Sequence, residues 1–293
     1  IVPALYAADK HYLTPRIDAS NYIDTVLKIA KDNDVKAITT LIDPEIEILA
    51  KNRERFEENN IIVLAPSKNT ASHCFDKYEM FCYLKENNIR TVLTYDSLEH
   101  FIEGYNNKEI DFPVFIKPRT GSGSVGIHKC TTMEELRSYF VEAKFDYIIQ
   151  EFMDCEDCDA DVYIDCYSHK PVAAFSKRKL ETKIGGASKT ISFKDQKLFD
   201  FIEDICQVLE FNGPVDMDFW YKDGQYYLSE VNPRFGGAYL HAYGAGVDFF
   251  KLIQNNMNGI TNKSIIGEYN EDILMMMYDG VVIINKDELV DLD

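Results

Sequence analysis

Hydrophobic positions in the first part of the chain follow two different periods. Residues 20–30 place apolar side chains every three or four positions, which predicts an amphipathic helix. Short apolar runs at 36–42 and 61–65 predict buried strands, and residues 43–60 between them have a helical pattern that opens with Asp-Pro. Strands that alternate with helices are typical of a parallel sheet with crossover helices. This part is therefore predicted to be an α/β layer.

After residue 111 the pattern changes to many short strands. Apolar and β-branched runs predict strands at 112–117, 125–129, 147–152, 161–166, 171–179, 215–221 and 225–231. Asp223-Gly224 separates the last two runs and is a strong hairpin signal. A helical pattern covers residues 195–211. The second part of the chain is therefore predicted to be α+β and mostly antiparallel.

The overall composition restricts the classes of function. The chain has 293 residues, enough for about two domains, and no apolar run approaches the roughly 20 residues of a membrane helix. With 31 Lys and Arg against 49 Asp and Glu, its net charge of -18 repels phosphate backbones and anionic lipids. We therefore expect neither a nucleic-acid partner nor a membrane partner.

The cysteines point to a reducing compartment. There are seven of them, without the short spacings of a disulfide framework, in a chain too long to need disulfides for stability. This pattern predicts a cytoplasmic protein. Cys155-Glu-Asp-Cys158 has the spacing of half a zinc site, but no second pair follows, so we interpret it as a surface turn.

A glycine-rich segment follows the predicted strand at 112–117. It reads Lys117-Pro-Arg-Thr-Gly-Ser-Gly-Ser-Val-Gly126 and joins two predicted strands. Glycines allow backbone N–H groups to approach phosphate oxygens, and a lysine at the strand end adds a positive charge. The segment is neither a P-loop nor a dinucleotide fingerprint. From these residues alone, a phosphate-binding loop and a simple hairpin loop both stay open.

Two carboxylates and an amide occupy the predicted hairpin around Asp223-Gly224. Asp218 lies on the first strand, and Glu230 and Asn232 lie on the second. These oxygen ligands suit Mg²⁺ or Mn²⁺ held jointly with nucleotide phosphates, whereas a solvated strand face is the alternative. A two-residue turn would put Asp218 and Glu230 on opposite faces of the hairpin. We therefore predict a three-residue loop with a left-handed Gly224, which puts both on one face.

The order and spacing of these motifs resemble the ATP-grasp superfamily. The resemblance rests on residues 112–126, on 148–153 (Ile-Ile-Gln-Glu-Phe-Met), and on Asp218 with Glu230-Val-Asn-Pro-Arg234. It is closest to the branch of biotin carboxylase and the large subunit of carbamoyl-phosphate synthase. Residues 2–70 resemble the pre-ATP-grasp domain of that branch, so nearly the whole chain is covered.

The resemblance implies a particular domain organisation. We expect a Rossmann-like α/β pre-ATP-grasp domain over residues 1–72, followed by a two-subdomain ATP-grasp fold over 73–293. A small lid subdomain would cover about 112–153. Relatives begin with a strand and a glycine-rich turn that have no counterpart after Ile1. The first domain is therefore expected to be truncated.

The resemblance also assigns roles to individual residues. ATP binding falls to Lys77, Lys117, Gly121, Ser122, Gly123, Ser124, Gly126, Glu151, Phe152, Met153 and Asp159. The two lysines and the glycine loop would contact phosphates, residues 151–153 the adenine, and Asp159 the ribose. Metal binding falls to Asp218, Glu230 and Asn232. The catalytic residues would be Arg234, Lys117 and Arg178, with Arg234 holding the carboxylate or its acyl-phosphate and Arg178 on the acceptor side.

The implied activity is that of an ATP-dependent ligase. Such an enzyme activates a small-molecule carboxylate as an acyl-phosphate for attack by an amine, with ATP converted to ADP and phosphate; its cofactors would be ATP and Mg²⁺ (or Mn²⁺), and it would form a homodimer. One alternative is phosphorylation of bicarbonate or carbamate, as in carbamoyl-phosphate synthase. The other is a non-catalytic ATP-binding subunit.

Overall fold

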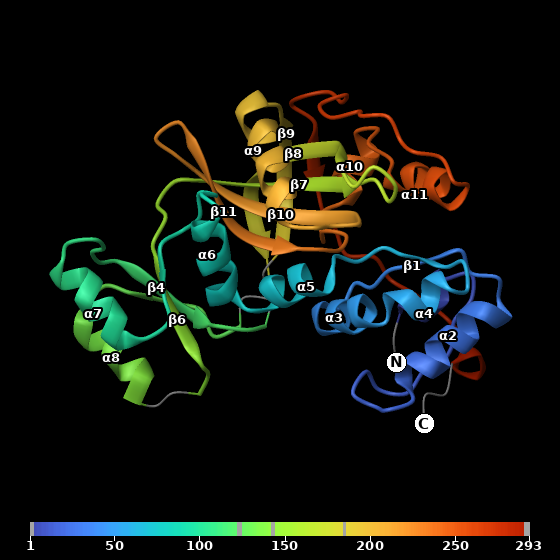
Figure 1. Cartoon of the computed structure of the whole chain (residues 1–293), viewed down its shortest axis with the longest axis horizontal. Helices are drawn as coiled ribbons and strands as arrows, with labels where there is room; N and C mark the ends of the chain where they lie inside the picture. The colour runs from blue at the N-terminus through green and yellow to red at the C-terminus, as the bar shows by residue number, and fades with distance from the viewer. Residues whose placement is uncertain (1–2, 122–124, 142–143, 184–185, 290–293) are drawn as a thin grey trace.

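Three β-sheets organise the computed structural model, which describes residues 3–121, 125–141, 144–183 and 186–289. Figure 1 shows two small layers on opposite sides of the molecule and a larger sheet that lies above both in this view. Helices α5 (Lys68–Phe75) and α6 (Lys77–Glu86) run between the small layers. The predicted sequence of an α/β part followed by an α+β part is therefore confirmed.

The N-terminal layer is built on two short parallel strands, as predicted. These are β1 (Ala37–Ile38) and β2 (Ile62–Val63), and the helices around them are α1 (Ala4–Ala7), α2 (Tyr22–Asp32), α3 (Asp43–Lys51) and α4 (Arg53–Glu57). Leu49, Phe56 and Val63 are fully buried at its centre. The single helix predicted over 43–60 is wrong, because Asn52 leaves the helical conformation and separates α3 from α4.

The second small layer contains the described parts of the glycine-rich segment, residues 117–121 and 125–126. Its sheet has the order β3 (Thr94–Tyr95), β6 (Tyr147–Glu151), β4 (Val114–Pro118) and β5 (His128–Cys130), with antiparallel pairs throughout. Helices α7 (Leu98–Asn106) and α8 (Met133–Val141) belong to this layer. Phe101, Ile116, Leu136 and Ile149 are fully buried in one cluster. The layer therefore has a core of its own.

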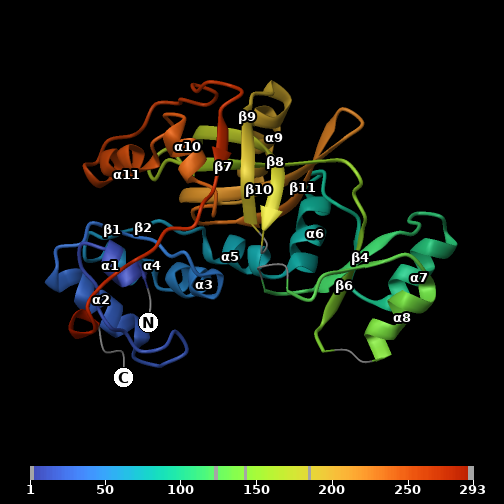
Figure 2. The same ribbon diagram turned by 180° about the vertical axis from the view of Figure 1, so that it is seen from behind.

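The large sheet has six antiparallel strands. Its order is β11 (Gln225–Asn232), β10 (Gly213–Lys222), β7 (Glu156–Ile164), β8 (Pro171–Lys183), β9 (Gly186–Phe193) and β12 (Leu274–Met276). Helix α9 (Gln196–Val208) buries Leu198, Ile202 and Ile205 in the same cluster as the strands. The remaining elements are α10 (Leu240–Gly244), α11 (Phe249–Met257) and the 3₁₀ turn η1 (Lys286–Glu288). Figure 2 shows the chain after β12 crossing back to the N-terminal layer.

The hairpin of β10 and β11 differs from its prediction in a way that matters for the site. Lys222 pairs with Gln225, so the loop has only two residues, Asp223 and Gly224, both with positive φ. The predicted three-residue loop is therefore wrong. Asp218 nevertheless lies directly opposite Glu230, because the register shifts by one residue between Asp218 and Phe219. This β-bulge, rather than the turn, puts the two carboxylates on one face.

Two further predictions can be compared with the structure. Cys158 does not lie in a surface turn, because it is part of β7 and is fully buried. Helix α5 spans the boundary expected between residues 72 and 73, so that division of the chain stays a prediction. None of the helices within the described ranges is long and apolar enough to cross a membrane.

Candidate functional site

A cavity of about 540 Å³ lies where the three layers meet. Of the sixteen site residues predicted from the sequence, thirteen are described by the structure, and eight of these line the cavity: Lys77, Lys117, Gly121, Asp159, Asp218, Glu230, Asn232 and Arg234. A larger cavity of about 970 Å³ lies between α4, the β7–β8 turn and the end of α9, and none of the predicted site residues that the structure describes lines it. We take the smaller of these two cavities as the candidate site, because the predicted lysines, carboxylates and arginine line it and do not line the larger one.

Lys77 is positioned by the start of helix α6. The carboxylate of Asp76 caps this helix by accepting hydrogen bonds from the backbone N–H groups of Tyr78 and Glu79, both at 3.0 Å. Asp76 also accepts a 2.6 Å bond from Arg119 Nε, just after β4. Lys77 Nζ donates to the carbonyl of Gly121. The helix start and the glycine-rich segment are thereby held together.

Lys117 reaches the same cavity from strand β4. It is only 8% exposed, and burial lowers the pKa of its ammonium, as does nearby Lys77, while Glu230 and Asp218 act in the opposite direction. Two ammonium groups close together in a partly buried site favour an anionic ligand. Gly121 and Gly126 both have positive φ, as a turning loop requires. Ser122, Gly123 and Ser124 lie outside the described residues.

The predicted metal ligands come together on adjacent strands. Asp218 pairs with Glu230, and Asp216 pairs with Asn232, so all four side chains share one face of the hairpin. Among the described residues, no group of three or more His, Cys, Asp or Glu side chains is placed to hold a metal by itself. Two carboxylates and an amide oxygen instead fit a hard cation such as Mg²⁺ that also takes ligands from a substrate phosphate.

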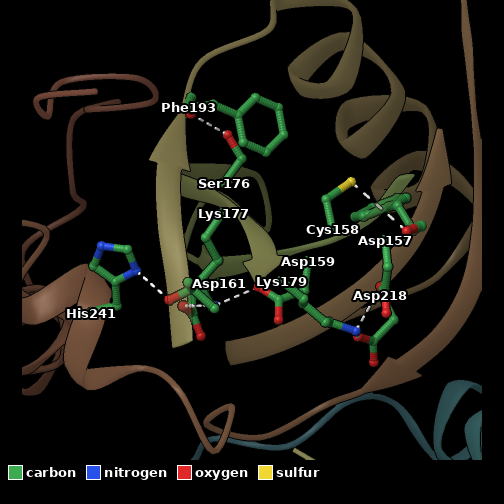
Figure 3. A network of polar contacts seen from close by, with 12 residues as sticks. Asp157, Cys158, Asp159, Asp161, Ser176, Lys177, Lys179, Phe193, Asp218 and His241 are labelled. Carbon is green, nitrogen blue, oxygen red and sulfur yellow. Dashed lines mark hydrogen bonds and ion pairs between the residues drawn. The ribbon is translucent and has the colours of Figure 1, made fainter. Parts of the chain in front are cut away.

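A lysine and carboxylate network on β7 and β8 adjoins these ligands (Figure 3). The ammonium of Lys177 is fully buried, 2.7 Å from Asp159 Oδ1 and 2.5 Å from Asp161 Oδ2. Burial alone would lower the pKa of Lys177, but the two carboxylates outweigh it and the pKa lies above its ordinary value. Burial raises the pKa of Asp159 to about 6, although Lys177 acts in the opposite direction. Asp159 thus lines the cavity but also anchors a buried cation.

Lys179 and Asp216 are site residues that the sequence reasoning missed. Lys179 lies between Asp218 and Asp157, and it lines the cavity. Asp216 lines it too, and burial and the neighbouring charge of Asp218 raise its pKa well above the ordinary value. A Cβ on Gly236 would lie 2.8 Å from Asp216 Oδ1, so a larger residue there would force the Asp216 carboxylate to shift. The available signal was the occurrence of like charges at every second residue, Lys177 and Lys179 on β8 and Asp216 and Asp218 on β10.

Arg234 is held by the N-terminal layer. Its Nε donates a 2.5 Å hydrogen bond to Asp43 Oδ1 at the start of α3, and its Nη1 donates to the carbonyl of Phe235 at 3.0 Å. Burial alone would lower the pKa of the guanidinium. The hydrogen bond and charge of Asp43 raise it by more, so the pKa lies above its ordinary value. The cavity therefore contains a fixed arginine whose orientation depends on a residue far away in the sequence.

Other predicted residues do not line this cavity. Glu151 ends β6 and pairs with Lys222 Nζ at 2.9 Å, Phe152 packs edge-on against Phe115, and Met153 is buried. Gly126 also lies outside the cavity lining.

Arg178 is likewise not brought into the cavity. Successive side chains on a strand point to opposite faces, and Arg178 alternates with Lys177 and Lys179 on β8. Its guanidinium instead bonds to Glu156 at 2.8 Å and lies 4.1 Å from the ring centroid of Phe193.

Comparison with known proteins identifies the family. The sequence model of the ATP-grasp domain matches residues 74–238, and that of the PylC-like N-terminal domain matches residues 1–64. The chain belongs to the ATP-grasp family, and the resemblance stated from its motifs is confirmed.

Individual relatives are more distant. D-alanine–D-alanine ligase B of Clostridium perfringens is 28% identical over 216 residues, which cover 67% of this chain and 71% of that protein. The biotin carboxylase domain of Hydrogenobacter thermophilus 2-oxoglutarate carboxylase, solved with MgADP and bicarbonate, has a TM-score of 0.71 at 18% identity. The L-amino acid ligase of Bacillus licheniformis has a TM-score of 0.64 at 16% identity.

The coverage of the two solved structures is unequal. This chain is covered at 92% and 88%, respectively, but it spans only 64% of each of those chains. Their likeness shows the ATP-grasp fold.

Proposed function

We propose that this chain is an ATP-dependent ligase that joins a small-molecule carboxylate to an amine and converts ATP to ADP and phosphate. The observation that carries the proposal is the convergence of two lysines, three oxygen ligands and one arginine on a single cavity, namely Lys77, Lys117, Asp218, Glu230, Asn232 and Arg234. The reaction class agrees with the names of the D-alanine–D-alanine ligase and the L-amino acid ligase that this chain resembles.

The cavity residues would divide the work of phosphoryl transfer. Lys77 and Lys117 both line the cavity, and they would hold the triphosphate in line for attack and offset its charge. Asp218, Glu230 and Asn232 would hold Mg²⁺ or Mn²⁺, which when bound neutralises charge on the phosphates. Residues 121–126 would close over the phosphates, and Glu151, Phe152 and Met153 would hold the adenine. No nucleophilic side chain is required.

Arg234 would orient the substrate carboxylate. One carboxylate oxygen forms a bond to the γ-phosphorus, and the bond from that phosphorus to the β–γ bridging oxygen breaks, which releases ADP. The amine nitrogen then forms a bond to the acyl carbon, the acyl carbon–oxygen bond breaks, and phosphate leaves with that oxygen while the amine loses a proton to solvent. Exclusion of water from the cavity would protect the acyl-phosphate.

A second candidate is phosphorylation of bicarbonate or carbamate, as in carbamoyl-phosphate synthase. It is favoured by the likeness to a biotin carboxylase domain solved with bicarbonate. In that case bicarbonate alone would stimulate ADP formation, whereas the ligase requires an organic acid. A non-catalytic ATP-binding subunit would bind ATP and release no phosphate under either condition.

We also propose a cellular location, an oligomeric state and domain bounds for the enzyme. Free cysteines and strong negative charge favour a cytoplasmic location, and the biotin carboxylase domain that resembles this chain was solved as a dimer. A homodimer is therefore proposed here, with residues 1–72 as the pre-ATP-grasp domain, 73–293 as the ATP-grasp domain and about 112–153 as its lid. Light scattering would measure the mass of the particle.

The test of the reaction is phosphate release from ATP across a panel of carboxylates, including amino acids, with hydroxylamine as a general amine. The proposal predicts phosphate release that depends on one class of carboxylate, together with a hydroxamate product that reports the acyl-phosphate. Release with bicarbonate alone would instead support the second candidate. Absence of release with every acid, from protein that binds ATP, would contradict catalysis.

A further inference from the structure

Lys179 makes an unusual pair of contacts for a lysine in this cavity (Figure 3). Its ammonium donates a short hydrogen bond to Asp218 Oδ1 and lies 2.9 Å from Asp157 Oδ1. Its side chain is 14% exposed and lines the cavity. One of its two carboxylate partners is thus the residue proposed above as a metal ligand, and the other is not.

The neighbouring Lys177 provides a comparison. It also bridges two carboxylates, Asp159 and Asp161, but its side chain is fully buried and does not line the cavity. Asp159 lines the cavity, but Lys177 does not, so its ammonium could not turn to a phosphate there and instead stabilises the sheet. The contact between Lys179 and Asp218, in contrast, faces the space in which metal and nucleotide would meet.

A divalent cation on Asp218 and the ammonium of Lys179 on the same carboxylate would repel each other strongly at such short range. One of the two cations has to leave. The carboxylate of Asp157 gives Lys179 a second anchor from which its ammonium can turn without entering solvent. A phosphate group in the cavity would offer that ammonium a new anionic partner.

We propose that Lys179 is the resident counter-ion of Asp218 in the metal-free protein. It competes with the divalent metal for this carboxylate and, once displaced, turns to the nucleotide phosphates. This inference rests on the proposed function, because it takes Asp218 as a metal ligand. Lys179 then makes metal binding depend on nucleotide binding, since the phosphates replace the one carboxylate partner that the displaced ammonium loses, while Asp157 is retained.

The test measures binding of Mn²⁺ alone, by the electron paramagnetic resonance signal of the free ion, without turnover. Lys179→Met should bind Mn²⁺ about fivefold more tightly than the unmodified protein when no nucleotide is present, as expected for removal of a partly buried ion pair. Lys183→Met is the matched control on the same strand, because Lys183 is exposed, pairs with Glu181 and does not line the cavity. It should leave Mn²⁺ affinity unchanged.

The dependence on nucleotide gives a second readout. Adding ADP should tighten Mn²⁺ binding severalfold more in the unmodified protein than in Lys179→Met. Lys179→Gln, which keeps polarity without charge, should behave like Lys179→Met and guards against a packing defect in the first variant. Equal or weaker Mn²⁺ affinity in both folded variants would overturn the role of Lys179.

A third variant separates this inference from the proposed function. Asp218→Asn should abolish Mn²⁺ binding with and without ADP. If it does so while both Lys179 variants match the unmodified protein, the inference fails and the metal site stands. If Asp218→Asn binds Mn²⁺ normally, or if the unmodified protein binds none even with ADP, the metal site and the inference both fail.

Discussion

Glu230 connects two parts of the candidate site through a single side chain. It lies opposite Asp218 across the hairpin, and its charge acts on the buried ammonium of Lys117. A carboxylate at this point can hold a metal and offset a lysine at once. Its chemistry, rather than its packing, should therefore decide its importance.

Glu230→Gln tests this at the residue scale. The substitution keeps the shape of the side chain and removes its charge, so we expect turnover to fall by at least about 100-fold with little change in the melting temperature. Phosphate release and thermal unfolding measure the two effects. Glu181→Gln is the control and should keep full activity, because Glu181 is a partly exposed carboxylate on β8 that does not line the cavity. Full activity in Glu230→Gln would contradict the metal assignment.

Asp159 has a structural role, as a partner of the buried Lys177, that the sequence did not reveal. Because it is one of two carboxylates on the fully buried Lys177 and Asp161 remains, Asp159→Asn should lower the free energy of unfolding by about 2 kcal/mol, the scale of one hydrogen bond to a charged group. It should also raise the KM for ATP if the ribose assignment is right. Chemical denaturation measures the first effect and initial rates measure the second. Unchanged stability would show that Asp161 alone satisfies Lys177.

At the scale of elements, the hairpin shows what the sequence could determine. The Asp-Gly pair correctly located the turn, and the motif correctly put Asp218 and Glu230 on one face. The turn type was wrong, because nothing in the local pattern marks a bulge after Asp218. The strands β9 and β12 were missed for a related reason: they depend on pairing with distant strands.

His241 gives a test of how helix α10 is attached to the large sheet. Its ring is 2% exposed, accepts from Thr190 on β9 and donates from Nε2 to the carbonyl of Ile273. Burial, with the charge of Lys177, lowers its pKa to about 4. The unfolded chain therefore binds a proton here below about pH 6.5, and the folded protein does so only near pH 4.

Stability should accordingly fall as the pH drops from about 6.5 to 4. For this one group the loss is about 3 kcal/mol in the free energy of unfolding. Denaturation curves at pH 7 and pH 4 should show a smaller loss in His241→Gln than in the unmodified protein. His11→Gln is the control, because His11 is exposed near the start of the chain. If His241→Gln lost as much stability between pH 7 and pH 4 as the unmodified protein, a neutral His241 would not be what attaches α10 to the large sheet.

At the scale of the whole molecule, the ion pair of Asp43 and Arg234 joins the N-terminal layer to the candidate site. The sequence identified Arg234 through its motif. It gave no sign of Asp43, because 191 positions separate the two residues. The same holds for Lys179: motif spacing finds residues on one hairpin, whereas partners from other strands and layers appear only when the chain is folded.

Asp43→Ala should therefore impair the reaction from outside the ATP-grasp domain. Arg234 would lose the partner that fixes its Nε, so kcat/KM for the carboxylate should fall about tenfold, the scale set by losing one positioning contact. Initial rates at varied carboxylate concentration measure this. Asp24→Ala, which removes the exposed pair with Arg55 in the same layer, should have no effect. Equal activity in both variants would show that the contact of Asp43 with Arg234 does not contribute to the reaction.

The most direct measurement of the central claim is thermal unfolding with and without Mg²⁺-ATP. A ligand at 100 times its Kd stabilises the folded protein by about 2.7 kcal/mol, so the melting temperature should rise clearly. The rise should disappear in Lys117→Ala, which removes a cavity lysine, and persist in Lys197→Ala on the exposed side of α9. No rise in the unmodified protein, or an equal rise in Lys117→Ala, would contradict the assignment of this cavity to ATP.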